Sequence, residues 1–162
     1  MSDTIPITPE GYERIREELK RLKTIERPSV IQEIAEARAL GDLSENAEYH
    51  SAREKQGFIE SRISDLDSKL ARLNVIVPPQ KGIPEAVVFG SYVRLRDVTD
   101  GQHAADQRYR IVGDLEADVK NNSISLSSPI ARSLINKHVG DVVSVILPRG
   151  EKEYEIIAIS YE

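Results

Sequence analysis

Two carboxylates, Asp42 and Glu45, stand close together in a short polar turn between two long stretches of helical pattern. Carboxylate oxygens suit a hard divalent cation such as Mg²⁺, which commonly takes one or two protein carboxylates and fills its remaining positions with water or phosphate. Two carboxylates alone are too few for a self-sufficient metal site. We therefore expect a second molecule to complete any metal chemistry at this turn.

The same pair also has a purely structural interpretation. Asp-x-x-Glu before a long helix is a capping box, in which Asp42 accepts a hydrogen bond from the backbone N–H of Glu45 and Glu45 reaches back. Acidic residues in a first turn also suit the helix dipole. The length of the flanking helices favours the chemical interpretation, because a capping box needs no long support.

Cationic side chains lie near the turn, with Arg38 before it and Arg53 and Lys55 after it. One interpretation is that they form ion pairs on solvated helix faces. The other is that they hold a nucleic-acid phosphate or single strand while the carboxylates act at the reacting bond. Tyr49 either packs between the helices or offers a stacking surface, and packing is the interpretation we favour.

The helices that position these residues are predicted from the spacing of apolar residues, which alternates between three and four as in the seam of a coiled coil. After the turn the seam consists of Tyr49, Ala52, Gln56, Ile59, Ile63, Leu66, Leu70 and Leu73. It predicts a helix over residues 44–74, on the order of 45 Å long at 1.5 Å per residue. Helices joined by so short a turn must be antiparallel. We therefore predict a two-helix rod that projects into solvent.

The first helix is predicted to begin with Thr8 as N-cap and Pro9 at its first position, after an irregular lead-in over residues 1–9. Its seam slips by one residue between Leu22 and Val30. Because Pro28 lies inside the slip, we predict a kink or short break near residues 25–28. Gly41 is the natural left-handed residue that ends the helix.

Beyond the proline-rich residues 78–84, which we interpret as a linker, the apolar pattern changes to the alternation of strands. Strands are predicted over residues 87–89, 92–95, 108–112, 124–126, 142–147 and 154–159. A short helix is capped by Ser128 and opened by Pro129. The predicted fold is α+β: an antiparallel two-helix coiled coil over residues 1–77, then a mostly antiparallel sheet with one helix over residues 85–162.

Composition excludes several classes of function. The 162 residues include no cysteine, which excludes disulfides, thiolate metal sites and cysteine nucleophiles. No long apolar run or basic-then-apolar leader is present, so we expect a cytoplasmic protein without a membrane span. A net charge of −5 argues against a broad duplex-DNA face. Any contact with nucleic acid must be local or arranged by a partner.

Residues 41–54, which read GDLSENAEYHSARE, closely resemble the tip of the bacterial Gre transcript-cleavage factors. Residues 110–114 (RIVGD), 116–118 (EAD), 124–125 (IS) and 128–132 (SPIAR) resemble the C-terminal domain of the same family. The resemblance covers nearly the whole chain in one register. It is stronger to the GreA branch, because GreB hairpins are more basic.

The resemblance implies a function and roles for the residues of the turn. In this family the coiled coil enters the secondary channel of RNA polymerase, and a C-terminal domain of FKBP-like fold docks on the channel's rim. Asp42 and Glu45 match the acidic pair that helps hold the second Mg²⁺ and the attacking water. Arg38 and Arg53 match the basic patch that contacts the 3′ end of a backtracked transcript. Ser44 stands where close relatives often have a basic residue.

The resemblance also implies that the protein is not itself an enzyme. It stimulates the cleavage activity of the polymerase, the free chain binds no cofactor, and we expect a monomer. The alternatives are a Gre-like paralogue that inhibits polymerase, an independent metal-dependent hydrolase, a scaffold that clamps clients, and a prolyl isomerase.

Overall fold

The computed structural model describes residues 3–42, 46–79, 82, 84–101 and 105–162. Contacts divide the chain into two compact units. One, the hairpin unit, is Tyr12–Leu73, and the other, the sheet unit, combines Met1–Gly11 with Asn74–Glu162. The domain limits inferred from the sequence, 1–77 and 85–162 around a linker at 78–84, stay a prediction.

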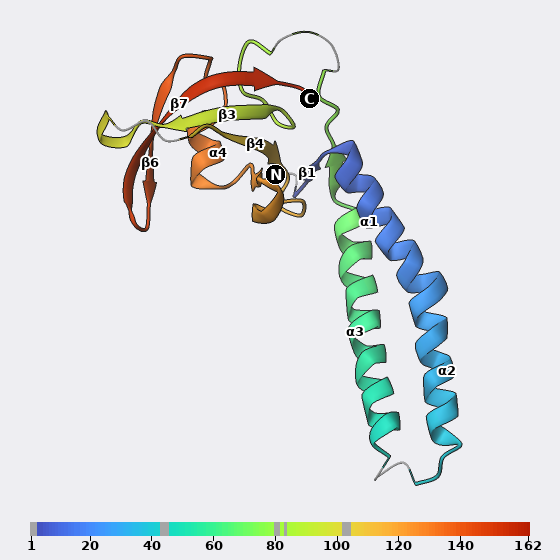
Figure 1. Cartoon of the computed structure of the whole chain (residues 1–162). Helices are drawn as coiled ribbons and strands as arrows, with labels where there is room; N and C mark the ends of the chain where they lie inside the picture. The colour runs from blue at the N-terminus through green and yellow to red at the C-terminus, as the bar shows by residue number, and fades with distance from the viewer. Residues whose placement is uncertain (1–2, 43–45, 80–81, 83, 102–104) are drawn as a thin grey trace. The chain divides into compact units, whose positions relative to one another are not determined.

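The hairpin is made of two antiparallel helical arms (Figure 1). The first arm runs through α1 (Pro9–Arg21), a π-helical segment (Leu22–Glu26) and α2 (Arg27–Arg38). The second is α3 (Ala47–Leu70). The predicted start of the first helix is confirmed, since the Thr8 hydroxyl oxygen accepts a hydrogen bond from the Gly11 backbone N–H at 3.1 Å.

The kink or short break predicted near residues 25–28 is not found, because the arm continues without a break through a π-helical segment at Leu22–Glu26. The Arg27 backbone N–H donates to the carbonyl of Leu22, five residues back. This wider turn holds one extra residue. The extra residue accounts for the spacing of eight, in place of seven, between the seam residues Leu22 and Val30. Leu22 and Val30 are consequently both buried, and Pro28 falls in the first turn of α2.

The predicted seam is buried along most of the hairpin. Its buried members are Ile15, Leu19, Leu22, Val30, Ile34 and Ala37 in the first arm, and Ala52, Ile59, Ile63 and Leu66 in the second. The prediction is wrong at Leu73, because α3 ends at Leu70 and Leu73–Val75 forms strand β2. The partner of β2 is β1 (Ile5–Ile7), so the predicted irregular lead-in is also wrong. A strand of three residues shows little alternation, and its central residue, Pro6, is unfavourable in most strand positions, so the sequence signal is weak.

The sheet unit contains a five-stranded sheet in the order β5-β4-β3-β7-β6. Its strands are β3 (Tyr92–Asp97), β4 (Gln107–Val112), β5 (Ser123–Ser125), β6 (Val142–Leu147) and β7 (Gly150–Ser160). All neighbours are antiparallel except β4 and β5, which confirms the α+β prediction with a mostly antiparallel sheet. Short 3-10 segments lie at Thr99–Gly101 and Val119–Asn121.

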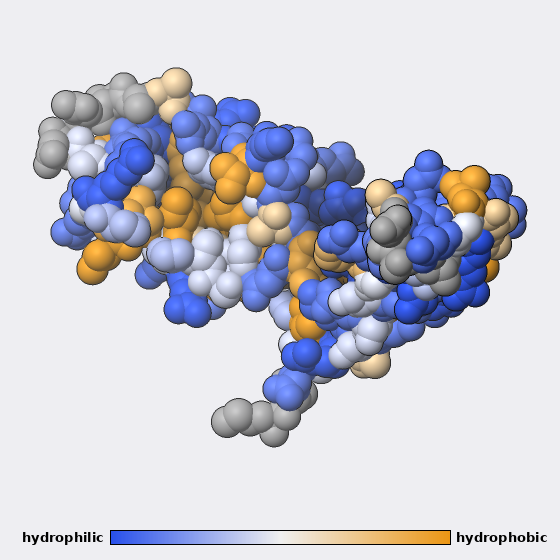
Figure 2. Space-filling model, turned by 90° about the horizontal axis from the view of Figure 1, so that it is seen from below, coloured by the Kyte–Doolittle hydropathy of each residue, from blue (hydrophilic) through white to orange (hydrophobic). Residues whose placement is uncertain are grey.

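Helix α4 (Pro129–Leu134) packs against one face of this sheet. Its predicted cap is confirmed, because the Ser128 hydroxyl accepts from the Ala131 N–H at 3.2 Å. Ala131 and Leu134 join Val93, Leu95, Ile111 and Ile156 in the core. Figure 2 shows apolar side chains gathered on the displayed face of the sheet unit.

The predicted strand over residues 87–89 is wrong. Val87 is fully buried, but its backbone bonds to the segment after α4, with its N–H donating to the Lys137 carbonyl and its carbonyl accepting from the Asn136 N–H. The chain then turns at Gly90, whose φ is +85°.

Within the described residues, none of the helices is long and apolar enough to cross a membrane.

Candidate functional site

The turn that joins α2 to α3, here called the tip, begins where α2 ends at Arg38. The N–H of Leu40 donates to the Ala37 carbonyl at 3.1 Å, and Gly41 follows with φ of +125°. The positive φ predicted for Gly41 is confirmed, but Gly41 is not the C-cap, because α2 already ends at Arg38 and Ala39 is its C-cap residue. The next residue, Asp42, is exposed. Glu45 lies outside the described residues, so its place at the tip stays a prediction.

Asn46 closes the tip, and the sequence interpretation missed it. Its side-chain oxygen accepts from the Tyr49 backbone N–H at 3.0 Å, which makes it the N-cap of α3. Its side-chain NH₂ donates to the Ala37 carbonyl at 2.6 Å. One amide thus ties the end of α2 to the start of α3. Asparagine is among the preferred N-cap residues, so its type directly before Ala47 was a usable signal.

This cap corrects the prediction that the second helix begins near Ser44. Helix α3 begins at Ala47, and the side chain that caps it belongs to Asn46. Asp42 is therefore not the N-cap of α3. The structural interpretation of the carboxylate pair, which made Asp42 the capping residue, does not describe this helix start.

Arg38 and Tyr49 meet across the tip. The guanidinium carbon of Arg38 lies 5.8 Å from the centroid of the Tyr49 ring, a cation–π contact. The ring of His50 makes an edge contact with the same tyrosine at 5.5 Å. Tyr49 is half-buried, as the packing interpretation predicts. The contact holds the Arg38 side chain, which is exposed, at the end of α2.

The other two cations near the tip have polar partners. Arg53 is exposed and donates to the side-chain oxygen of Gln56 at 3.0 Å. Lys55 forms a 3.0 Å ion pair with Glu33 on the opposite arm. Lys55 therefore follows the structural interpretation, which predicted ion pairs on solvated helix faces. The pair differs from that prediction only in joining two arms. The partner of Arg53 is a neutral amide, so this hydrogen bond does not offset the positive charge of the exposed guanidinium group.

An acidic hollow of about 420 Å³ lies between the arms near the tip. Glu33, Glu36 and Glu48 line it together with small residues of both arms. Sequence analysis did not predict this hollow, because only the antiparallel register of α2 and α3 brings these glutamates together. Nowhere in the described part of the chain do three or more His, Cys, Asp or Glu side chains form a group that could hold a metal ion.

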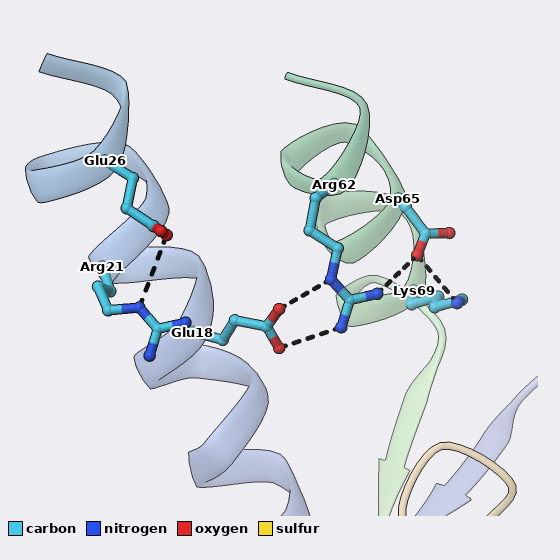
Figure 3. Close-up of polar contacts among 6 residues, drawn as sticks. All are labelled: Glu18, Arg21, Glu26, Arg62, Asp65 and Lys69. Atoms are coloured by element: carbon cyan, nitrogen blue, oxygen red, sulfur yellow. Dashed lines mark hydrogen bonds and ion pairs between the residues drawn. The ribbon is translucent and has the colours of Figure 1, made fainter. Parts of the chain in front are cut away.

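The rest of the hairpin, here called the shaft, is joined by ion pairs on both sides of the seam. Arg62 donates to both carboxylate oxygens of Glu18, at 2.8 and 3.1 Å (Figure 3). Arg27 makes the same two-bond contact with Glu60, at 2.7 and 2.8 Å. The hydrogen bond from Arg62 lowers the pKa of Glu18, and that from Arg27 lowers the pKa of Glu60.

Asp65 extends this network along α3. Its carboxylate accepts from Arg62 at 3.3 Å and from Lys69 at 3.0 Å (Figure 3). Paired guanidinium and carboxylate groups have fixed geometry. The shaft is therefore a defined support, made of a buried seam with charged contacts on its flanks.

Comparison with known proteins assigns both parts of the chain. Residues 5–75 match the family model described as transcription elongation factor, N-terminal, and residues 82–161 match the model described as transcription elongation factor, GreA/GreB, C-term. Transcription elongation factor GreA of Thermodesulfovibrio yellowstonii is 54% identical over 162 residues, covering 100% of both chains. GreA of Ralstonia nicotianae is 53% identical over 158 residues, covering 98% of each chain.

Among solved structures, Gfh1 of Thermus aquaticus is 27% identical, with a TM-score of 0.43 over 98% of this chain and 99% of that one. The GreA/GreB factor from Nitrosomonas europaea is 22% identical, with a TM-score of 0.41 over 98% and 100%. The family models and the full-length relatives carry the assignment. The resemblance inferred from the tip sequence is confirmed: this chain belongs to the GreA/GreB family of transcription elongation factors.

Proposed function

We propose that this protein inserts the tip of its hairpin into the secondary channel of RNA polymerase and stimulates cleavage of backtracked nascent RNA by the polymerase itself. Cleavage frees the arrested complex by creating a new 3′ end. Membership of the GreA/GreB family supports the proposal, and the relatives with about half of their residues identical are named as GreA.

The observation that carries the proposal is the placement of Asp42. Its carboxylate is exposed at the end of a long hairpin, and Asn46 supplies the cap that α3 needs. An acidic residue on a rigid support can act on a reacting centre that is far from its own fold. We assign the same role to Glu45, from its position in the sequence.

The chemistry that we assign to the two carboxylates is the completion of a metal site in the polymerase. Two-metal phosphoryl transfer needs ions about 4 Å apart, which stabilise the attacking and the leaving oxygens. Mg²⁺ binds through a few carboxylates together with phosphate and water. Asp42 and Glu45 supply oxygen ligands to a second Mg²⁺ shared with the polymerase, and one of them orients or deprotonates the attacking water.

Arg38 and Arg53 hold the 3′ end of the extruded RNA in this proposal. Both are exposed on the hairpin, and among the residues that the structure describes neither forms an ion pair with a carboxylate. Guanidinium groups suit phosphate because their planar fork matches its oxygens. Arg38 is the better positioned of the two, since its contact with Tyr49 fixes it beside the tip.

The protein donates ligands and is not a nuclease by itself. The sheet unit docks on the rim of the channel, and the Mg²⁺ site exists only in the complex. A prolyl isomerase or a client-clamping scaffold predicts no dependence on Asp42 and Glu45, and an independent hydrolase predicts cleavage of naked RNA, so one assay separates all three from the proposal.

The assay uses stalled, backtracked polymerase complexes with labelled RNA, and compares wild type with Asp42→Asn and Glu45→Gln. Wild type should release short 3′ fragments, and each variant should slow release by about 100-fold or more, the lower range for a positioned acid–base group. Binding of each variant to polymerase should be unchanged. The matched control is Glu48→Gln, which removes an exposed acidic charge from the first turn of α3.

Three results would overturn the proposal. Equal cleavage by wild type and both variants would remove the role of the tip. Cleavage of naked RNA by the free protein would make it a hydrolase. Binding to the channel without any stimulation of cleavage by wild type would make it an inhibitory member of the family.

A further inference from the structure

One face of the sheet unit carries an unusual set of side chains, here called the Arg–Tyr face. It consists of Tyr92, Arg94, Arg108 and Arg110, on the adjacent strands β3 and β4. The strands are in register so that Tyr92 lies opposite Arg110, and Arg94 lies opposite Arg108. Directly opposed residues share a face of the sheet. The four side chains therefore form one compact block.

The Arg–Tyr face is the face that α4 does not cover. Side chains alternate between the two faces of a strand, and the neighbours Val93, Leu95 and Ile111 are buried in the core with α4. Arg94 and Arg108 are exposed, as expected for residues that point the other way. The block of arginines consequently faces away from the core.

A hollow of about 220 Å³ opens within this face. Tyr92, Arg94 and Arg108 line one side of it. On β7, opposite Tyr92 and Arg94, stand the small residues Ser160 and Ala158, which leave room. Glu162 also lines the hollow, and its main-chain oxygen accepts from the Ser160 hydroxyl at 2.8 Å.

The aromatic ring at the centre of the face is in contact with two guanidinium groups. That of Arg108 lies 4.1 Å from the centroid of the Tyr92 ring, and that of Arg110 lies 5.1 Å from it. Arg110 is itself held, donating to the Gly90 carbonyl at 3.2 Å and to Glu10 at 3.4 Å. Arg110 thus orders the tyrosine, and the tyrosine orders Arg108.

The hollow in this face has an excess of positive charge, because Arg94 and Arg108 line it together with one acidic residue, Glu162. Arg110 is paired with Glu10, and the neighbouring Arg96 is paired with Asp106 at 2.9 Å. In the portion of the chain that the structure describes, no ion pair is found for Arg94 or Arg108. In a protein of net charge −5, two such cations side by side are a local exception.

We propose that the Arg–Tyr face binds single-stranded RNA. Arg94 and Arg108 contact backbone phosphates, and a base stacks on the exposed guanidinium plane that Tyr92 supports. Surfaces that bind single strands combine cations for the backbone with planar groups for the bases, and arginine serves both purposes. An acidic peptide would bind through the charge of the arginines and would make no use of the stacked arginine and tyrosine. A base can stack on them, and this difference favours RNA as the ligand.

The inference goes beyond the proposed function, because it concerns a second RNA contact on the sheet unit. It is tested on the full-length protein without polymerase, so its failure leaves the role of the tip untouched. To exclude binding by the hairpin, all proteins in the test carry Arg38→Gln and Arg53→Gln. The probe is a fluorescent single-stranded RNA of about 12 nucleotides, within the usual site size for such surfaces.

Fluorescence anisotropy at several salt concentrations gives the affinity and its salt dependence. Adding Arg94→Gln and Arg108→Gln should weaken binding at least about 10-fold, and should reduce the log–log salt slope by about 1.4, which corresponds to about 0.7 for each of two phosphate contacts. Tyr92→Phe should bind as the parent does, because the ring is kept. Tyr92→Ala should weaken binding with the salt slope nearly unchanged.

The control is Arg149→Gln, which removes an exposed arginine at the β6–β7 turn and should change neither quantity. An equal loss in Arg149→Gln would mean that binding follows net charge alone, and would overturn the proposal. So would the same affinity with and without Arg94 and Arg108. Tighter binding of a polyglutamate peptide than of the RNA, lost in the same double variant, would assign the face to an acidic protein segment instead.

Discussion

Along the shaft of the hairpin unit the two arms are joined by a buried apolar seam and by ion pairs, whereas the tip combines a few contacts between the arms with exposed charged side chains. Ile63 and Leu66 are buried in the seam, and Arg62 bonds to Glu18 of the other arm. At the tip, Asp42 and Arg38 are exposed, and Asn46 closes the turn. The residues that make the hairpin stiff therefore lie in the shaft, and the tip carries exposed charged residues.

The largest expected effect is a loss of hairpin stability when a buried residue of the seam is shortened. Leu66→Ala should destabilise the hairpin by about 2–5 kcal/mol, the usual cost of a large-to-small core substitution, because Leu66 is only 1% exposed. Thermal unfolding followed by circular dichroism measures the loss. Below the unfolding temperature, cleavage per bound protein should match wild type. An unchanged transition would mean that the seam does not hold the arms together.

A change at Asn46 should affect both regions, because this residue joins them. Asn46→Ala should cost about 1 kcal/mol in cap energy, and should also slow cleavage, since the chain that leads to Asp42 loses its tie to Ala37. Asn46→Asp keeps the acceptor for the Tyr49 N–H and loses the donor to Ala37. It should therefore retain most of the stability and lose part of the cleavage rate. Identical behaviour of the two variants would contradict the separate roles of the two bonds.

The ion pairs of the shaft should contribute less. A double-mutant cycle with Glu18→Gln and Arg62→Gln should give a coupling energy of about 0.2–1 kcal/mol, the range for exposed pairs. Chemical denaturation of the four proteins measures it. Cleavage should be the same in all four. A cleavage defect without loss of stability would mean that these shaft residues take part in function, and would contradict the division between a supporting shaft and a functional tip.

The smallest effect should be a dependence of hairpin stability on acid. The folded-state pKa values of Glu18 and Glu60 lie below the ordinary value of 4.5, because Arg62 and Arg27 donate hydrogen bonds to them. A lowered pKa in the folded state means that this stability is present above about pH 4.5 and is lost as the pH falls through the lowered values. Thermal unfolding between pH 6 and 3 should show the loss. The double variant Glu18→Gln/Glu60→Gln should show a smaller dependence.

The sequence predicted the shaft well, because seam residues such as Ile59 and Ile63 repeat over many turns of one helix. The one-residue slip between Leu22 and Val30 was visible in the sequence, but we interpreted it as a kink or break at Pro28, and the structure absorbs it in a π-helical turn. The prediction failed at Leu73, which keeps the seam spacing and yet begins a strand, because the strand that pairs with it, Ile5–Ile7, is distant in sequence. It failed at Val87 for a related reason, since the partners of that backbone follow α4.

The candidate site was predictable to the extent that it depends on the turn itself. Asp42 and Arg38 lie at the tip because α2 ends at Arg38 and the chain turns at Gly41, directly before Asp42. The contact of Arg38 with Tyr49 and the closure by Asn46 depend on how the two arms pack. The Arg–Tyr face was beyond sequence analysis, because Arg94 and Arg108 become neighbours only through the register of β3 and β4.

The most direct test of the central claim is the Mg²⁺ dependence of RNA cleavage in backtracked complexes. If Asp42 and Glu45 supply ligands to a second ion, wild type should reach its full cleavage rate at a lower Mg²⁺ concentration than the Asp42→Asn/Glu45→Gln protein. High Mg²⁺ should then narrow the difference between them, since mass action replaces part of the lost affinity. If the two proteins follow the same Mg²⁺ dependence and differ only in maximal rate, the carboxylates do not bind the ion, and the account is wrong.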